Sequence, residues 1–556
     1  MRHHALIAGC SLIAATLAGP AIADPVRVDP LPKPMAAAFA AISETDLRAD
    51  VTFLTADGLR GRMSLEPGDD AATAWVAAQF AHAGLQPAAI DADGHPSYLQ
   101  AVPLVQYVPD THRSFIALGD TRFSQPAYSG AYRDDLDLTA PLVFAGYGIT
   151  VPDLGYDDYQ GIDARGAIAL VFAHEPQEDD PASHFNGAGN TRNATSRVKA
   201  LNAQAHGAQA VIILPEPNRK HPSDVERLQR IGGSVTRSPA LPIQARADDE
   251  LHIPVLTLTD PVTKAIFSAG GADAGALQAA IDRDLTPHGT ALHTAPLHIH
   301  LENAERSRGV TYNVAGVLPG SDPALAGETL IVSGHHDHDG ASGDATHIWH
   351  GADDNASGTV GVVALAHAFA EMPVRPKRSI LFTVFAAEER GLLGSYAMAA
   401  HPLRPLATTR AMINFDMIGR NETPSAQTDG LITIPADTTN RLNLIGAPYS
   451  PDLNAVIVAS NRGIGLDLDS RFDRDNVLNV FFRSDQFPFV LHDIPAFWFF
   501  TGFHPDYHHE TDTADKINYA KMARILRLSG TALWALGNSS KVPAFVPDPV
   551  GSSLPR

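Results

Sequence analysis

The sequence predicts an α/β fold in which a mostly parallel central sheet is flanked by helices and interrupted by an inserted β-rich domain. Between about residues 310 and 540, continuous apolar runs such as ETLIVSG and SILFTVFAA alternate with helical stretches such as ASGTVGVVALAHAFAEM. This alternation is typical of a sheet that is covered on both faces. Between about 130 and 295, short β-branched runs separated by Gly, Pro and Asp surround one helical stretch, SRVKALNAQAHG, which indicates a separate β-rich unit.

The composition is that of a large globular chain. The 556 residues are 44% hydrophobic and 19% charged, and at about 100–200 residues per domain they correspond to roughly two to four domains. The 41 Lys and Arg residues are outnumbered by 62 Asp and Glu residues, so the formal net charge is −21. Because no run of basic residues offers a positive surface, we expect no nucleic-acid partner.

The N-terminus has the pattern of a cleavable export signal. A basic start, MRHH, precedes the apolar stretch ALIAGCSLIAATLAG and the small residues Ala21 and Ala23, so residues 1–23 are predicted to be removed. We therefore expect an exported protein, periplasmic or extracellular. The string ending at Cys10 resembles a lipoprotein cleavage box, but cleavage there leaves a long apolar stub, so simple export is favoured over lipid anchoring. No run is long enough to predict a transmembrane segment.

The remaining chain divides into three predicted parts and a tail. Residues 24–129 form the N-terminal part of the main domain and contain a helical stretch from about Asp70 to Ala83. Residues 130–295 form the insertion, in which we see no cluster of catalytic groups and which we expect to restrict access to a site elsewhere. Residues 296–541 form the rest of the main domain, and residues 542–556 form a Pro-rich flexible tail.

Metal-ligand residue types follow the predicted strands of the main domain. In a parallel sheet the ligand site lies beyond the carboxyl ends of the strands. The residues at these positions are His335, His336, Asp337 and His338 after ETLIVSG, Glu388 and Glu389 after SILFTVFAA, Asp416 after RAMINF, and Tyr507 and His508 after AFWFFTG. The pair Asp353–Asp354 stands just before a predicted helix. Five separate segments therefore bring carboxylate or imidazole groups to one edge.

Each of these groups has a structural explanation when it is taken alone. Asp353 and Asp354 could cap the helix that follows them, and Glu388 and Glu389 could be charges favoured by a helix dipole. Helix capping does not explain why several unrelated loops place such residues at the same sheet edge. The coincidence favours a functional site.

The set suits zinc, which accepts imidazole nitrogen and carboxylate oxygen in open catalytic sites. Two histidines and three carboxylates are too many for one tetrahedral ion but suit two ions that share a bridging carboxylate. Adjacent side chains such as Glu388 and Glu389 point about 100° apart on a helix or about 180° apart on a strand, so they cannot easily bind one ion together. We expect one of them to be a ligand and the other to move protons.

These motifs resemble those of the co-catalytic di-zinc aminopeptidases, relatives of glutamate carboxypeptidase II, the transferrin receptor and the glutaminyl cyclases. The matching strings are SGHHDHDG, GADDNASG, FAAEERGLLGS, INFDMIG, RSDQFPF and PDYHHETDTADKIN, and they occur in the family's order. The resemblance implies a zinc-exopeptidase-like fold for the main domain. The insertion resembles the protease-associated domain that many members of this family carry.

The resemblance also implies a role for each site residue. His335 and Asp416 would hold one zinc ion, Glu389 and His508 the other, and Asp354 would bridge the two. Glu388 would be the general base, Asp337 would orient the His335 imidazole, Tyr507 would lie near the reacting carbonyl, and Asp353 would be structural. The chain departs from the family at Gln486, where many members have His, and at His509–Glu510, where Thr-Pro is common. These departures leave the implied ligands intact.

The function implied is a secreted zinc-dependent aminopeptidase, with two Zn²⁺ per chain, that acts on peptide substrates. One alternative is a carboxypeptidase of the glutamate carboxypeptidase type or a glutaminyl cyclase, although cyclases use a single zinc ion. A second is a non-catalytic, receptor-like binding protein, which the intact ligand set argues against. A serine hydrolase is disfavoured because no G-x-S-x-G turn follows a predicted strand. The sequence leaves the N-terminal residue preference and the oligomeric state open.

Overall fold

The computed structural model describes residues 30–185, 189–223, 242–428 and 430–547, together with residues 28, 187 and 226. The predicted export signal lies outside these ranges, as do residues 548–556 of the predicted tail. Within the described ranges, no helix is long and apolar enough to cross a bilayer. The described part of the tail packs on the surface, where Val546 N donates to Tyr449 O at 2.8 Å and the Phe545 ring stacks on the Tyr449 ring.

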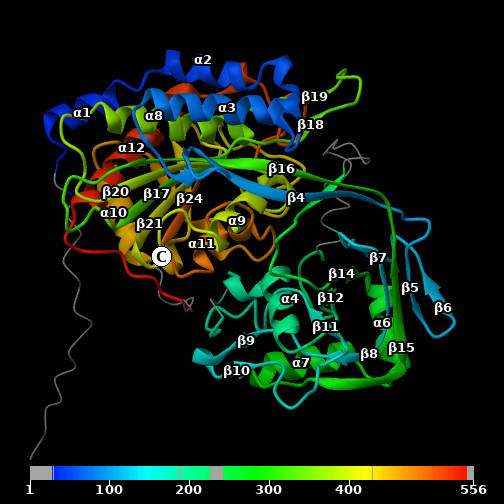
Figure 1. Ribbon diagram of the computed structural model, residues 1–556. Coiled ribbons are helices and arrows are strands. Elements are labelled where there is room, and N and C mark those ends of the chain that lie inside the picture. The colour runs from blue at the N-terminus through cyan, green and yellow to red at the C-terminus, as the bar shows by residue number, and fades with distance from the viewer. Residues whose placement is uncertain are drawn as a thin grey trace, which may run out of the picture.

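The main domain is built on a central sheet of ten strands (Figure 1). Four neighbouring strands at its centre are parallel, and antiparallel pairs extend it on both sides. The predicted α/β fold class is thereby confirmed. Across the sheet the strands are β13 (Ile243–Arg246), β4 (Leu99–Pro109), β16 (Asn303–Leu318), β20 (Ser379–Phe385), β17 (Thr329–His335), β21 (Thr409–Phe415), β24 (Ala496–Phe500), β22 (Arg441–Ile445) and β23 (Asp467–Asp469), while β1 (Gln86–Pro87) pairs with β16.

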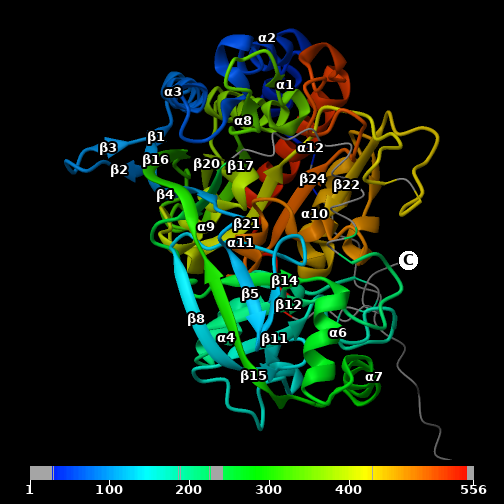
Figure 2. The ribbon, with the colours of Figure 1, turned by 90° about the vertical axis from the view of Figure 1, so that its right-hand side faces the viewer.

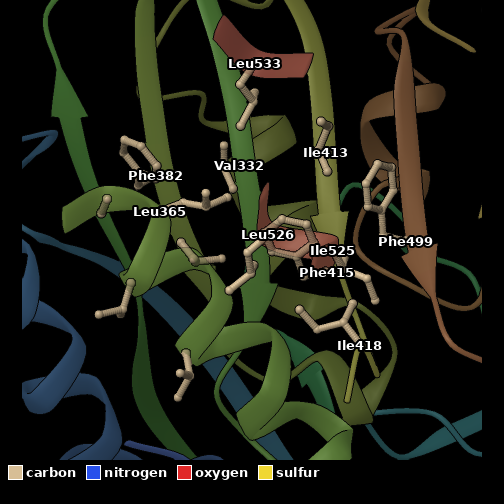
Figure 3. Packing of buried hydrophobic residues seen from close by; sticks show 14 of the residues in the cluster. Val332, Leu365, Phe382, Ile413, Phe415, Ile418, Phe499, Ile525, Leu526 and Leu533 are labelled. Atoms are coloured by element: carbon tan, nitrogen blue, oxygen red, sulfur yellow. The ribbon is translucent and has the colours of Figure 1, made fainter. Parts of the chain in front are cut away.

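The central strands are apolar throughout because both faces of the sheet are covered. Successive side chains of a strand point to opposite faces. In β17, Leu330 and Val332 belong to one hydrophobic cluster and Ile331 belongs to another on the opposite face. Figure 3 shows Val332 packed with Leu365 and Phe382 in the first cluster. The continuous apolar runs of the sequence are therefore strands with two buried faces.

Two layers of helices supply this cover (Figure 1). The larger layer packs on the face that carries Leu330 and Val332, and a smaller layer packs on the opposite face. The larger layer consists of α1 (Lys33–Ala40), α2 (Glu44–Leu54), α3 (Pro67–His82), α8 (Gly358–Ala370), α10 (Pro451–Asn461) and α12 (Tyr519–Asn538). The smaller layer contains α9 (Leu393–Ala400) and α11 (Phe487–Val490).

The insertion has its own sheet of eight strands and its own hydrophobic cores. Its central strands β8, β11, β12 and β14 are parallel, and helices lie on both faces. Across the sheet the strands are β6 (Thr121–Phe123), β5 (Phe115–Leu118), β15 (Thr290–Leu301), β8 (Leu136–Phe144), β11 (Ile168–Phe172), β12 (Ala210–Leu214), β14 (Val255–Leu258) and β7 (Tyr128–Ser129). Helices α6 (Asp260–Ala269) and α7 (Ala274–Asp284) cover one face, and α4 (Ser196–Ala205) covers the other.

The insertion is joined to the main domain by a long two-stranded ribbon (Figure 2). Strand β4 leads out of the central sheet, and β15 returns through β16, which pairs with β4 along its length. Strands β5, β6 and the end of β15 belong to the insertion's sheet although they lie outside the predicted span 130–295. Strand β13, which lies inside that span, pairs with β4 in the central sheet.

Short ribbons and turns complete the described chain. Two-stranded ribbons form between β2 (Ala89–Ile90) and β3 (Pro96–Ser97), between β9 (Thr150–Val151) and β10 (Tyr156–Asp157), and between β18 (Gly340–Ala341) and β19 (Ile348–Trp349). Short helical turns that matter for the site are η1 (Asp57–Arg62), η4 (Ala352–Ser357), η5 (Glu388–Arg390) and η9 (Val480–Phe482).

Candidate metal centre

The sequence-predicted site residues meet at the carboxyl ends of the four parallel central strands. His335 is the last residue of β17, Asp416 directly follows β21, and Glu388 begins the turn after β20. Strand β24 leads into the loop that carries His508, and Asp354 lies in turn η4 just before α8. Because parallel strands end at the same edge of a sheet, residues far apart in the sequence become neighbours.

Asp354 lies between two groups of ligand-type side chains. Its Oδ1 is 3.4 Å from His335 Nε2, and Asp416 Oδ1 is 3.5 Å from the same nitrogen. Its Oδ2 is 3.1 Å from His508 Nε2, and Glu389 Oε2 is 3.5 Å from that nitrogen. The five residues therefore form two adjacent sites with one shared carboxylate.

Glu388 lies beside the first of these sites. Its Oε2 is 3.8 Å from His335 Nε2, and the residue borders the cavity described below. Burial raises the pKa of Glu388 well above its usual value, and the nearby charges of Asp416 and Glu389 add to the effect against the opposing influence of His335. Glu388 thus lies near His335, whereas its neighbour Glu389 lies near His508.

Asp337 holds the turn that carries both glutamates. Its carboxylate accepts hydrogen bonds from the backbone N–H groups of Glu388 and Glu389 at 3.0 and 3.3 Å. The same carboxylate is 3.7 Å from His335 Nδ1, whose closer neighbour is the Asp337 backbone oxygen at 3.2 Å. Asp337 is therefore placed to orient the ligand-bearing loops as well as the imidazole.

Buried carboxylates hold the loop around Asp354 by hydrogen bonds to backbone N–H groups. The Asp512 carboxylate accepts hydrogen bonds from the backbone N–H groups of Asp353 and Asp354 at 2.8 and 3.1 Å. Asp353 accepts from Gly419 N at 2.7 Å and lies 3.2 Å from His504 Nε2, so its side chain points away from the two sites.

Two residues that the sequence interpretation left without a role also lie at the centre. His338 Nδ1 is 2.7 Å from Glu389 Oε1, and its imidazole is grouped with Asp354 and Glu389. Asp339 Oδ2 is 2.8 Å from His508 Nδ1, which orients that imidazole. Both belong to the string HHDHDG, but the string alone does not show which of its side chains face the site. The side chain of His336 turns the other way, and its Nδ1 is 2.8 Å from Asp69 Oδ1.

A cavity of about 250 Å³ opens over the two sites. The Tyr507 hydroxyl accepts a hydrogen bond from Arg483 Nη2 at 3.3 Å at the cavity wall. No residue of the predicted insertion, within the part of the chain that the structure describes, lines this cavity. Its walls are Asp354, Glu388, Glu389 and Asp416 on the ligand side, and Gly391, Leu392, Met417, Phe482, Arg483, Trp498, Phe503 and Tyr507 around them.

The donor set and the charge of the site fit two divalent cations of the zinc class. The carboxylates of Asp354, Glu388, Glu389 and Asp416 carry four negative charges when ionised, which is the charge that two such ions neutralise. Burial lowers the pKa of His335, but nearby carboxylates, Glu388 foremost, raise it well above its usual value. His335 Nε2 is buried and makes no hydrogen bond of acceptable geometry with the described residues. An imidazole nitrogen in this position is suited to be a metal ligand.

A second group of such side chains lies in the insertion, contrary to the expectation that this region carries none. It consists of His174, Glu178, Glu216 and His221. A third group, Asp137, His298 and His300, is more exposed.

Comparisons with known proteins place the two regions of the chain in families. Residues 313–532 match the model of Peptidase family M28, and residues 138–265 match the PA domain model. A probable zinc metalloprotease of Pyrenophora tritici-repentis is 34% identical over 166 residues, which are 29% of this chain and 34% of the relative. Leupeptin-inactivating enzyme 1 of Streptomyces exfoliatus is 26% identical over 43% of this chain and 51% of its own length. The chain thus spans between 34% and 51% of the length of these two relatives.

Among solved structures, the aminopeptidase from Aneurinibacillus sp. strain AM-1 is similar, with 19% identity, 93% of this chain and 98% of the other covered, and a TM-score of 0.48. The regions matched by the two family models contain the predicted ligand strings and most of the insertion. The family resemblance carried by the sequence motifs is confirmed for these two regions: residues 313–532 match Peptidase family M28 and residues 138–265 match the PA domain.

Proposed function

We propose that this chain is an exported two-zinc aminopeptidase that removes residues one at a time from the N-termini of peptides. The observation that carries the proposal is the position of Asp354, whose two carboxylate oxygens face His335 and His508 at 3.4 and 3.1 Å. A carboxylate shared by two buried sites suits a pair of cations that act on the same bound molecule. The export part of the proposal rests on the sequence of residues 1–23.

The residues around the cations would divide the work of hydrolysis. Zinc at these sites would supply Lewis-acid activation of a water molecule and of the scissile carbonyl. Glu388 would accept the proton of the attacking water and return it to the leaving amine, because its carboxylate borders the cavity and lies 3.8 Å from His335 Nε2 without being needed as a ligand. The hydroxyl of Tyr507, positioned by Arg483, would donate to the negative charge that develops on the carbonyl oxygen.

The cavity walls favour an apolar N-terminal residue. Large apolar side chains make up much of the lining: Leu392, Met417, Phe482, Trp498 and Phe503. A volume of about 250 Å³ accommodates a side chain the size of leucine or phenylalanine. We therefore propose that substrates beginning with Leu or Phe react faster than substrates beginning with Asp or Lys.

A carboxypeptidase remains the second candidate because of Arg483. This residue lines the cavity, and its Nη1 is buried without a hydrogen-bond partner among the described residues. A guanidinium group in such a place can bind the terminal carboxylate of a peptide. Under this alternative Arg483 would contact the substrate's C-terminus rather than serve only to position Tyr507.

The decisive experiment compares blocked and unblocked substrates on the purified zinc-loaded chain. Leu and Phe anilides should be hydrolysed, and their N-acetylated counterparts should react at least tenfold more slowly, because acetylation removes the free amine. An N-acyl dipeptide with a free C-terminus should not be cleaved. Preferential cleavage of that dipeptide would support the carboxypeptidase, and equal rates on acetylated and free substrates would overturn the aminopeptidase.

Chelation and metal analysis test the zinc part of the proposal. Treatment with 1,10-phenanthroline should abolish hydrolysis, and added Zn²⁺ should restore it. The Asp416→Asn and His508→Gln variants should each contain about one zinc ion fewer than the wild type, because each loses a ligand of a different site. Hydrolysis that survives complete zinc removal would refute a zinc mechanism, and the absence of any turnover would favour a receptor-like binding protein.

A further inference from the structure

The insertion brings two histidines and two glutamates together at the carboxyl ends of adjacent parallel strands. His174 and Glu178 follow β11, Glu216 follows β12, and His221 lies in the loop after Glu216. Strands β11 and β12 pair in register from Ile168 with Ala210 to Phe172 with Leu214, so both end at the same level. We call His174, Glu178, Glu216 and His221 the insertion cluster.

The side chains of the insertion cluster are buried and close together. His174 Nδ1 is 2.9 Å from Glu216 Oε1 and 3.1 Å from Glu178 Oε2, and His221 Nε2 is 2.7 Å from Glu178 Oε1. The four side chains are between 2% and 11% exposed. One nitrogen or carboxylate oxygen from each of the four lies within 4.8 Å of the others. This is the spacing of ligands around a single ion.

Three of the facing atoms approach one another without forming good hydrogen bonds, whereas His221 Nε2 and Glu178 Oε1 lie within hydrogen-bond distance at 2.7 Å. His174 Nδ1, Glu178 Oε2 and Glu216 Oε1 are all buried, and none has a hydrogen bond of acceptable geometry among the described residues. His335 Nε2 at the candidate metal centre shows the same combination, with carboxylate oxygens at 3.4 and 3.5 Å. Ligand atoms bound at about 2.0–2.2 Å to one zinc ion lie roughly 3–3.5 Å from each other, which is the spacing at His335. The contacts of the insertion cluster are somewhat shorter, at 2.7 to 3.1 Å.

The imidazole nitrogens of His174 and His221 that face away from the cluster also have neighbours within hydrogen-bond distance. His221 Nδ1 is 2.9 Å from Pro222 O, and its Nε2 is 2.7 Å from Glu178 Oε1. A histidine whose second nitrogen bonds a backbone carbonyl is the usual arrangement of a metal ligand. His174 Nε2 is 2.9 Å from the side-chain amide of Asn479, which lies in the main domain.

The buried carboxylates of Glu178 and Glu216 in the insertion cluster require positive charge nearby. Two buried carboxylates beside two imidazoles are strongly unfavourable unless a cation or protons on the imidazoles compensate them. Lys199 does not serve this purpose directly, because its Nζ donates to backbone oxygens, including His174 O at 2.6 Å. The neighbouring Glu175 carboxylate is occupied by the N–H and hydroxyl of Thr191 at 3.0 and 2.6 Å.

We propose that the insertion cluster binds one divalent cation of the zinc class, held by His174, Glu178, Glu216 and His221. Imidazole nitrogen with carboxylate oxygen is a donor set that zinc accepts. The ion would fasten the insertion to the main domain, since Asn479 Nδ2 contacts His174 Nε2 and Asn476 Nδ2 donates to Glu178 O at 3.2 Å. The same loop continues into Phe482 and Arg483 at the wall of the catalytic cavity.

Metal analysis of the full chain with and without the cluster tests the site. The zinc-loaded wild type, after removal of free metal, should contain one zinc ion more than Glu216→Gln, which keeps the size of the side chain but removes its charge. The control His298→Gln alters the exposed third group, and its zinc content should equal that of the wild type. Zinc content in Glu216→Gln equal to that of the wild type would overturn the proposal and indicate a proton-compensated ion-pair network.

A crystal of the wild-type chain provides a direct test that does not depend on how a variant folds. An anomalous difference map at the zinc absorption edge should show a peak between His174 Nδ1 and His221 Nε2. A map with peaks at the catalytic sites and none at the insertion cluster would refute this inference and leave the proposed function standing. A peak at the insertion cluster alone would support the inference and count against the two-zinc catalytic centre.

Discussion

Glu388 and Glu389 are adjacent in the chain but occupy different places in the site. Glu389 Oε2 is 3.5 Å from His508 Nε2 and its Oε1 is 2.7 Å from His338 Nδ1, as expected of a ligand. Glu388 borders the cavity and is 3.8 Å from His335 Nε2, as expected of a residue that handles protons. Asp337 accepts hydrogen bonds from the backbone N–H groups of both residues and so holds the turn from which the two side chains diverge.

Exchanging each glutamate for glutamine should separate the two roles. Glu388→Gln should keep the zinc content of the wild type and lose activity by roughly 10²–10⁴, the usual contribution of a general base. Glu389→Gln should lose zinc and activity together, because it removes a charged ligand. Zinc content, turnover and melting temperature of both variants are the measurements. Zinc loss in Glu388→Gln with full zinc in Glu389→Gln would reverse the assignment.

Arg62 supports the candidate metal centre without belonging to it. Its side chain is completely buried and donates to four backbone carbonyls. The acceptors are Leu54 O, His336 O, His350 O and Gly351 O, at 2.6 to 3.0 Å. Burial lowers the pKa of Arg62 to about 10, so the guanidinium remains charged at neutral pH beside Asp337 and Asp354.

Arg62→Met should therefore be strongly destabilising. It removes a hydrogen bond from each of four backbone carbonyls, of which Gly351 O keeps the N–H of Ala356, and it removes a charge that nearby carboxylates require. Together these losses cost about 3–5 kcal/mol. Arg60→Met is the matched control, because Arg60 is exposed and its side-chain hydrogen bond to Ser342 O is 3.4 Å long. The free energy of unfolding in urea is the measurement. Equal stability of the two variants would show that the Arg62 contacts add nothing to the fold.

At the scale of elements, helix α4 of the insertion is joined to helix α9 of the main domain through Arg197. The Arg197 guanidinium binds both oxygens of Asp249, at 2.6 and 3.0 Å, and lies 4.2 Å over the Tyr396 ring. Burial raises the pKa of Asp249, but the hydrogen bonds and charge of Arg197 outweigh it, so the pKa is lowered from 3.8. The carboxylate is therefore more easily ionised in the folded chain than in the unfolded chain.

This shift predicts a pH-dependent loss of stability in acid. A lowered pKa in the folded state stabilises the fold above the unfolded-state pKa of 3.8, and this contribution disappears as the pH falls through the lower folded-state value. Asp249→Asn should lower the free energy of unfolding by about 2 kcal/mol at pH 7, and this difference from the wild type should shrink below pH 4. Glu250→Gln, whose carboxylate is 60% exposed and also contacts Arg197, should change stability little. If the unfolding free energies of the wild type and Asp249→Asn differ by the same amount at pH 7 and at pH 3, the ion-pair explanation is contradicted.

At the scale of the whole molecule, the insertion meets the main domain at the loop that shapes the cavity. Asn479 accepts a hydrogen bond from Asn190 Nδ2 at 2.6 Å and contacts His174 Nε2 at 2.9 Å. Three and four residues later, Phe482 and Arg483 line the cavity. The insertion can therefore influence substrate binding through this loop, although none of its described residues lines the cavity.

Asn479→Gly should test this connection. Asn479 has a φ of 51°, which glycine adopts without strain, so the variant removes the side-chain contacts and keeps the backbone conformation. We expect KM for a Leu anilide to rise by about fivefold, the equivalent of about 1 kcal/mol, with kcat nearly unchanged. Michaelis kinetics on Asn479→Gly and Asn479→Ala give the measurement. A fall in kcat with constant KM would instead place the effect on the chemical step.

Much of the fold and the candidate site could be predicted from local sequence patterns. The apolar runs that became β17, β20, β21 and β24 are buried on both faces, which makes them visible without knowledge of their partners. The rule that ligand residues follow the carboxyl ends of parallel strands then pointed to the loops that meet in the structure. The same rule also covers His174 after β11 and Glu216 after β12, so the insertion cluster was within reach of sequence reasoning.

Other features depended on contacts between distant segments. Strand β13 lies within the predicted insertion but joins the central sheet, because hydrogen bonding at a sheet edge is decided by whichever segment the fold brings there. In the string HHDHDG, Asp69 draws His336 away from the site, while Glu389 holds His338 in it. No local pattern distinguishes these two histidines, since their partners lie far away in the chain.

The sequence by itself determined the residue types at the strand ends, the family and the alternation of strands and helices. The tertiary structure decided which of these residues share a site, that Asp354 faces both His335 and His508, and that a second buried cluster exists in the insertion. The physical reason is that local patterns report burial and backbone preference, which each segment carries alone. The direction of a buried polar side chain is set by the partners that compensate its charge, and here those partners come from other parts of the chain.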